Sequence, residues 1–214
     1  MKKILLLGDS IREGYDVYVK KAFSGLYDVV YPSENCRFSS YIIRNLADWA
    51  DALGCDEDTA LVHWNAGLWD DLTLFDGLRH TRPEIYEENI DRIDKMLRLL
   101  FPKAIFIFAT STPVQEELFK GRRAKRYNRD TVLYNEIAVR TLAPRGVIIN
   151  DLYTLLKDAP LEYHSDLTHY YTKEGTRLIS DRVIGVIADA LSAKPASLDY
   201  DALCGKSKEE ILGI

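Results

Sequence analysis

Lys3-Ile4-Leu5-Leu6-Leu7-Gly8-Asp9-Ser10, near the start of the chain, is the stretch of sequence that decides the fold. Its apolar run ends at a glycine, an aspartate and a serine, and it is shorter than the hydrophobic region of a signal peptide. We therefore expect a buried strand over Lys3–Leu7, followed by a helix whose first turn contains Ser10.

Four more short apolar runs alternate with stretches of helical period, which predicts βαβ units and a mostly parallel sheet. The expected strands are residues 27–31, 60–64, 104–108 and 147–149. The expected helices are residues 41–52, 84–101 and 129–142, and Lys173–Leu191. Five such strands predict a doubly wound α/β/α sandwich with its ligand crevice at the carboxyl ends of the strands.

Length and composition predict one globular domain over residues 1–194, with a tail at 195–214 that contains at most one short helix, Lys208–Leu212. A net charge of -5 and an isoelectric point near 5.5 argue against nucleic-acid binding. No apolar run approaches the roughly 20 residues that span a bilayer, so we expect a cytoplasmic protein without a membrane partner. The three cysteines, which lack metal-site spacing, are expected to be free thiols: Cys36, Cys55 and Cys204.

Polar residues follow the expected strands. They are Asp9-Ser10 after the first, Asn35-Cys36-Arg37 after the second, Asn65-Ala66-Gly67 after the third, and Asp166-Leu167-Thr168-His169 before the last long helix. Since the carboxyl ends of parallel strands share one edge, these groups are expected to converge there.

Ser10, His169 and Asp166 are the residue types of a nucleophilic triad. A serine becomes a good nucleophile when a base removes its proton, and that base needs an acid to fix its orientation. The side-chain amide of Asn65 can donate to an oxyanion in the same crevice. Simpler interpretations remain: Asp9 or Ser10 caps a helix, the Asp-x-x-His spacing is fortuitous, and Asn65 occupies a turn.

Three blocks, in order along the chain, resemble those of the SGNH (GDSL-type) hydrolases. They are Gly8-Asp9-Ser10-Ile11, Asn65-Ala66-Gly67-Leu68-Trp69-Asp70 and Asp166-Leu167-Thr168-His169. The resemblance covers about residues 1–190. It implies a flavodoxin-like fold with strand order 2-1-3-4-5. It also implies an enzyme that acts on acyl esters without a cofactor or metal.

Carried over position by position, the resemblance implies that Ser10 is the nucleophile, that His169 and Asp166 complete the triad, and that Ser10 and Asn65 donate to the oxyanion. Two departures stand out. The second block lacks the family's glycine, so that Arg37 is the expected replacement as oxyanion donor, and His63 and Ala66 stand where the third block commonly has glycine and aspartate.

Other side chains suggest a pocket more weakly. Trp64, Trp69 and Tyr170 are expected to line a substrate pocket, although core packing explains such aromatic residues equally well. His63, His164, Asp166 and His169 are metal-binding residue types without a metal motif, so we expect no metal. The basic run at residues 120–129 is either a lid that attracts an acidic substrate or a solvated loop.

We therefore expect a serine esterase that removes short acyl groups, such as acetyl, from a carbohydrate or small metabolite. Two alternatives stay open. One is a silent SGNH-like module that binds a glycan or a protein partner, and the other is an acyltransferase that uses the same serine. The sequence leaves the oligomeric state open.

Overall fold

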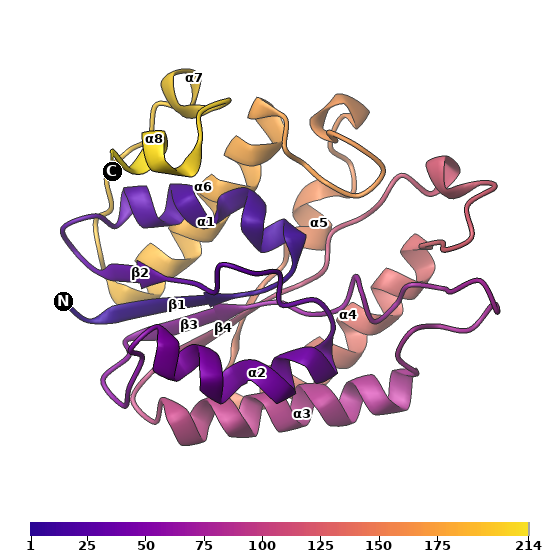
Figure 1. The fold of residues 1–214 in the computed structure, drawn as a ribbon, viewed down its shortest axis with the longest axis horizontal. Coiled ribbons are helices and arrows are strands. Elements are labelled where there is room, and N and C mark those ends of the chain that lie inside the picture. Colours follow the sequence, from indigo (N-terminus) through magenta and orange to yellow (C-terminus); the bar gives the residue numbers. More distant parts are fainter. Residues whose placement is uncertain (214) are drawn as a thin grey trace.

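The fold is a five-stranded parallel sheet between two layers of helices, in a computed structural model that describes residues 1–213 (Figure 1). The strand order is β2-β1-β3-β4-β5, which confirms the predicted order 2-1-3-4-5. The strands are β1 (Lys3–Leu7), β2 (Asp28–Val30), β3 (Leu61–Trp64), β4 (Ile105–Ala109) and β5 (Ile148–Asn150). Each lies within one residue of its predicted bounds.

Helices α1 (Ser10–Ala22) and α6 (Lys173–Leu191) pack together on one face of the sheet. Helices α2 (Ser39–Ala52), α3 (Pro83–Leu100) and α4 (Asn128–Leu142) cover the other face, below the sheet in Figure 1. A short helix that was not predicted, α5 (Leu152–Leu156), follows β5. None of the helices in residues 1–213 combines the length and hydrophobicity needed to cross a bilayer.

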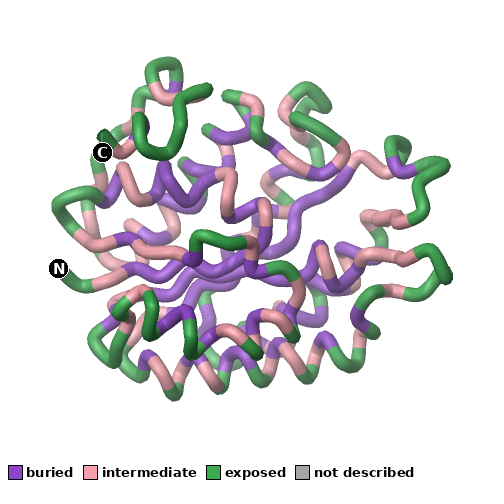
Figure 2. Tube along the Cα trace, viewed as in Figure 1, coloured by how far each residue is buried: buried purple, intermediate pink, exposed green. Residues whose placement is uncertain are grey.

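Alternate residues of β1 point into two separate cores. Leu5 and Leu7 belong to the cluster under α2, α3 and α4, whereas Ile4 and Leu6 belong to the cluster under α1 and α6. All four side chains are fully buried, because both faces of a parallel sheet are covered by helices. The purple strands at the centre of Figure 2 show this burial.

The C-terminal segment contains two short helices, α7 (Tyr200–Leu203) and α8 (Lys208–Leu212), whereas at most one was predicted. Tyr200 and Ile211 pack against Val17 and Tyr18 on the outer side of α1. The ammonium of Lys208 lies 2.7 Å from the buried carboxylate of Asp16, which the guanidinium of Arg12 also contacts at 2.6 Å. Residues 199–213 are therefore anchored on α1, so that the description as a tail was incomplete.

Two buried carboxylates attach the loop after β3 to the neighbouring helices. Asp70 accepts hydrogen bonds from the hydroxyl of Ser39 at 2.6 Å and from its backbone N–H at 3.1 Å, at the start of α2. Asp71 accepts one from the hydroxyl of Thr131 in α4 at 2.6 Å. These hydrogen bonds hold the first residues of the loop that leads to α3 against α2 and α4. Neither aspartate was assigned a role from the sequence.

Burial raises the pKa of Asp70 to about 6 and that of Asp71 to about 8, against the opposing effect of these hydrogen bonds. The pKa of Asp71 is therefore higher in the folded than in the unfolded chain. Between the ordinary carboxyl pKa and pH 8, the folded chain holds the Asp71 proton that the unfolded chain has released. The contribution of Asp71 to stability is therefore full at low pH and is lost as the pH rises towards 8.

We predict that Asp71→Asn flattens the pH dependence of stability between pH 6.5 and 8. In the wild type the free energy of unfolding falls there by at most about 1.4 kcal/mol per pH unit, because the folded chain holds the Asp71 proton that the unfolded chain has already released. The amide oxygen of the variant can still accept the Thr131 hydrogen bond. Urea unfolding at pH 6.5, 7.2 and 8.0 tests this, and parallel profiles for the two proteins would contradict it.

Candidate active site

Ser10, Asn65, Asp166 and His169 meet at the carboxyl edge of the sheet. Ser10 begins α1 directly after β1, with Asp9 as the N-cap whose carboxylate accepts the N–H of Ile11 at 3.0 Å. Asn65 follows β3, and Asp166 and His169 lie in the loop before α6. The topology therefore brings together the first, third and last sequence blocks.

A continuous chain of short hydrogen bonds joins the serine, the histidine and the aspartate. The Oγ of Ser10 lies 2.7 Å from Nε2 of His169, and Nδ1 of His169 lies 2.7 Å from Oδ2 of Asp166. With Nδ1 donating to the carboxylate, Nε2 carries the lone pair that can accept the serine proton. This is the geometry of a nucleophile, its general base and the acid that orients the base.

The other oxygen of Asp166 is held by its own loop. Oδ1 accepts the N–H groups of Thr168 at 2.7 Å and His169 at 2.8 Å. Partial burial opposes ionisation of Asp166, but the hydrogen bonds from His169 and Thr168 outweigh it and lower the pKa of the carboxyl below its ordinary value. The acid stays ionised and can stabilise an imidazolium.

Asn65 is linked through Asp9 to the turn between β1 and α1 that contains Ser10. Its side-chain amide donates to Oδ1 of Asp9 at 3.0 Å, and both residues are buried. A Cβ at Gly8 would lie 2.0 Å from Oδ1 of Asn65, so that only glycine permits this approach. The second amide hydrogen of Asn65 remains for another acceptor.

Arg37, which replaces the glycine of the second block, has a left-handed backbone conformation that is usually found at glycine. Its φ of +53° lies in the left-handed region, where non-glycine residues are uncommon. Its backbone N–H donates to Oδ1 of Asn35 at 2.8 Å, and its guanidinium lies 4.8 Å from the ring centre of Tyr41. The predicted oxyanion donor is therefore already bonded within its own loop.

A cavity of about 550 Å³ opens beside the serine. Its lining includes Ser10, His169, Trp69 and Phe119, together with arginines of the basic run. Of the three aromatic residues predicted to line a substrate pocket, Trp69 lines this cavity.

Trp64 and Tyr170 belong to the core instead. Trp64 is fully buried and its ring packs edge-on against Phe108, with 4.8 Å between centres. Tyr170 is 2% exposed and its hydroxyl donates to the carbonyl of Pro113 at 3.0 Å. Neither ring lines the cavity beside Ser10, because both side chains point to the packed side of their segments.

The basic run contributes three arginines to the cavity: Arg122, Arg123 and Arg126. The side chain of Arg126 is largely buried; its Nε donates to the carbonyl of Leu68 at 2.6 Å and lies 3.8 Å from Asp71. The run is therefore not uniformly solvated, because one of its guanidinium groups connects it to the loop after β3.

His63 lies inside the sheet, away from any metal-binding arrangement. It is fully buried, with ring nitrogens 3.2 Å from the Asn150 amide and 3.4 Å from the Tyr15 hydroxyl. Burial lowers its pKa to about 3. Among residues 1–213, no group of three or more His, Cys, Asp or Glu side chains is placed to hold a metal ion.

Tyr171, next to Tyr170 in the chain, packs directly against the histidine of the site. Its ring stacks on that of His169, with centres 4.8 Å apart and planes at 19°, and its hydroxyl donates to the carbonyl of Ser10 at 2.5 Å. A Cβ at Gly14 of α1 would lie 2.7 Å from Cε1 of this ring.

Comparison with known proteins identifies the fold. No family model and no curated protein matches the sequence. A lipase/acylhydrolase from Enterococcus faecalis has a TM-score of 0.71 and 19% identity over 92% of this chain and 100% of that chain. An acetyl xylan esterase gives 0.65 and 16%, over 86% and 99%. A member of the lipolytic protein G-D-S-L family from Veillonella parvula gives 0.62 and 20%, over 88% and 99%. The chain thus has the fold of the GDSL-type, or SGNH, hydrolases.

We predict that Gly14→Ala lowers the reactivity of Ser10 without destabilising the fold. Alanine gains up to about 1 kcal/mol in a helix, but its methyl group displaces Tyr171 from His169, which we expect to slow labelling of Ser10 by a fluorophosphonate about ten-fold or more. Gly185→Ala, where an added Cβ meets nothing within 4 Å, is the matched control in α6. Equal labelling rates for both variants would exclude this role for Tyr171.

Proposed function

We propose that the chain is a serine ester hydrolase of the SGNH family that removes short acyl groups, such as acetyl, from a carbohydrate or small metabolite. The observation that carries this proposal is the hydrogen-bonded chain from Ser10 through His169 to Asp166 beside an open cavity. The fold shared with lipases, acylhydrolases and an acetyl xylan esterase supports the same reaction class.

In the first half of the reaction, Ser10 Oγ attacks the ester carbonyl while His169 Nε2 takes the serine proton. The tetrahedral intermediate collapses, the bond to the alcohol breaks, and the imidazolium returns its proton to the leaving oxygen. In the second half, His169 deprotonates a water that attacks the acyl-serine, and Ser10 recovers its proton. Asp166 holds the imidazole in the required tautomer throughout.

Two donors are placed to stabilise the oxyanion. Ser10 is the first residue of α1, so that its N–H has no acceptor within the helix, and the positive end of the helix dipole lies beside it. The free amide hydrogen of Asn65 is the second donor. We leave Arg37 out of this role, because its N–H is engaged by Asn35.

We predict that Ser10→Ala reduces hydrolysis of p-nitrophenyl acetate by about 10³ or more, because the nucleophile is lost. Intact mass after fluorophosphonate treatment is expected to show one adduct in the wild type, mapped to Ser10, and none in the variant. Ser24→Ala, an exposed serine after α1, is the control. An unlabelled wild type that hydrolyses no ester would favour the alternative of a silent binding module.

For Asn65→Ala we predict a fall in kcat of about 10²–10³ with little change in KM, as for the loss of one oxyanion donor. Since this change also leaves Asp9 without its amide partner, thermal unfolding must be measured on the same sample. A rise in KM with unchanged kcat would instead assign Asn65 to binding of the substrate in its ground state.

A further inference from the structure

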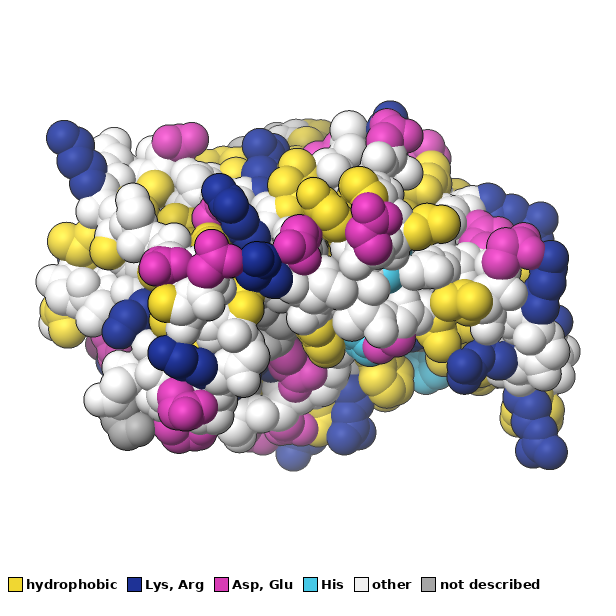
Figure 3. Space-filling view, turned by 90° about the horizontal axis from the view of Figure 1, so that it is seen from above, with side chains coloured by type: hydrophobic (Ala, Val, Ile, Leu, Met, Phe, Trp, Pro, Cys, Tyr) yellow, Lys and Arg dark blue, Asp and Glu magenta, His cyan; other side chains and the backbone are white. Residues whose placement is uncertain are grey.

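A second cavity, of about 620 Å³, adjoins the active site and is lined by positive charge. It lies between the loop after β3 and the segment that leads into α4. Its six cations are Arg79, Arg82, Arg122, Arg123, Lys125 and Arg129, and its one carboxylate is Asp130. Figure 3 shows Lys and Arg side chains gathered at one end of the molecule. We call this cavity the arginine pocket.

The positive charge of the arginine pocket is largely uncompensated. Asp130 pairs with Arg79 at 2.7 Å and lies 3.9 Å from Arg129, and among the described residues the other four cations have no carboxylate within 4 Å. A cavity of similar volume, about 600 Å³, between α3 and α4 has the opposite character: two arginines face three carboxylates there. Because the whole chain carries a net charge of -5, this concentration is not a consequence of composition.

Two helices also begin at the arginine pocket. α3 starts after Arg82 and α4 after Tyr127, and neither N-cap residue provides a side-chain hydrogen bond to its helix. Both N-cap residues line the pocket. The positive end of the α3 dipole adds to the attraction that the guanidinium groups exert on an anion, whereas at α4 the N–H of Asn128 already donates to the carboxylate of Glu116.

The frame of the pocket is fixed by backbone hydrogen bonds. Thr73 and Lys125 exchange N–H···O bonds of 2.9 and 2.8 Å, which tie the two walls together. Arg122 and Arg123 line both this pocket and the active-site cavity. A molecule with its ester carbonyl at Ser10 can therefore extend past these two arginines into the arginine pocket.

We propose that the natural substrate is an ester that carries a phosphate or diphosphate group, which the arginine pocket binds while the acyl group lies at Ser10. This inference rests on the proposed hydrolase function and adds the charge of the substrate to it. Guanidinium groups bind phosphate through paired hydrogen bonds, and the volume of the pocket admits more than one phosphate group.

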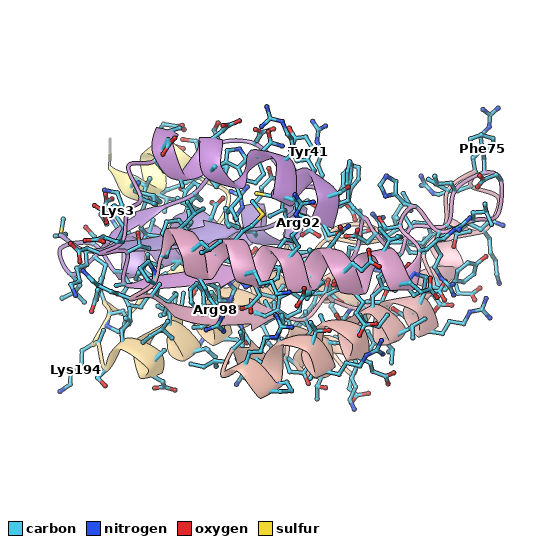
Figure 4. The ribbon with its side chains drawn as sticks, turned by 90° about the horizontal axis from the view of Figure 1, so that it is seen from below. Lys3, Tyr41, Phe75, Arg92, Arg98 and Lys194 are labelled. Atoms are coloured by element: carbon cyan, nitrogen blue, oxygen red, sulfur yellow. The ribbon has the colours of Figure 1, made fainter. Side chains whose placement is uncertain are left out.

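Exposed apolar side chains at the rim raise the question of where the phosphate comes from. Phe75 is 84% and Leu78 61% exposed, and Phe75 lies at the far end of the molecule (Figure 4). Both a soluble phosphorylated ester and a phospholipid headgroup offer the same chemistry. Sedimentation with phosphatidylglycerol vesicles, against phosphatidylcholine vesicles, separates them, and pyrophosphate binding without sedimentation identifies a soluble ester.

The binding arm of the test uses the Ser10→Ala protein, so that it does not depend on turnover. Pyrophosphate and citrate are each titrated calorimetrically into the Ser10→Ala protein. The same titrations are repeated with the Ser10→Ala protein that also carries Arg82→Gln and Arg129→Gln. Both arginines lie outside the active-site cavity. We expect pyrophosphate to bind more tightly than citrate and the double substitution to weaken it about ten-fold or more. Arg140→Gln, in the cavity between α3 and α4 where two arginines face three carboxylates, is the control.

The catalytic arm compares an O-acetylated sugar with the same sugar carrying a phosphate. This arm uses the protein with Ser10 intact and measures kcat/KM for the phosphorylated ester divided by kcat/KM for the uncharged ester. We expect Arg82→Gln/Arg129→Gln to reduce this ratio about ten-fold or more and Arg140→Gln to leave it unchanged. The inference is overturned if pyrophosphate does not bind, if citrate binds more tightly, or if the two sets of substitutions act alike. Failure of the proposed function would appear differently, as a wild type that hydrolyses neither ester.

Discussion

The parallel pairing of β1 with β3 is the constraint on which the site depends. In this register Leu7 lies opposite Trp64, and the N–H of Asn65 donates to the carbonyl of Leu7 at 3.1 Å. The residues that follow the two strands, Gly8 and Asn65, are therefore neighbours, and the missing side chain of Gly8 leaves the space that the Asn65 carboxamide fills. A shift of register by one residue would exchange the faces of the strand and separate Asp9 from its amide partner.

The fold was predictable because its determinants are local. Apolar runs of four or five residues, interrupted by glycine and polar residues, specify buried strands, and the predicted bounds of α6 are the observed ones. The meeting of Ser10 with His169 and Asp166 joins distant segments, and it was expected from the shared carboxyl edge of the parallel strands and from the resemblance of three sequence blocks to SGNH hydrolases. The helices α5 and α7, with five and four residues, were not predicted, whereas α8, which also has five residues and begins with a capping box at Ser207, was.

The features that the sequence did not reveal depend on contacts between distant segments. Trp64, Trp69 and Tyr170 are all aromatic residues close in sequence to the candidate site. Whether each lies in the core or lines the cavity depends on the direction of its side chain, which the sequence does not specify. The stacking of Tyr171 on His169 requires a glycine on a different element, Gly14, more than 150 positions away in the chain. Asp70 and Asp71 appear as ordinary loop carboxylates until the structure places them against Ser39 and Thr131.

The distribution of charge follows from where long connections leave the sheet. The strands and the helix faces that pack on them are apolar, and many surface carboxylates are paired, as Glu87 is with Arg140. The two loops after β3 and β4 extend beyond the sheet in Figure 1, and arginines from both loops line one cavity in which Asp130 is the only carboxylate among the described residues. Because a cleft of one sign concentrates ligands of the opposite sign, this arrangement places a positive field beside Ser10 in an otherwise acidic protein. In the proposed reaction the same field would favour the negative charge that develops on the ester oxygen, so that one set of side chains would stabilise both the proposed substrate charge and the charge in the transition state.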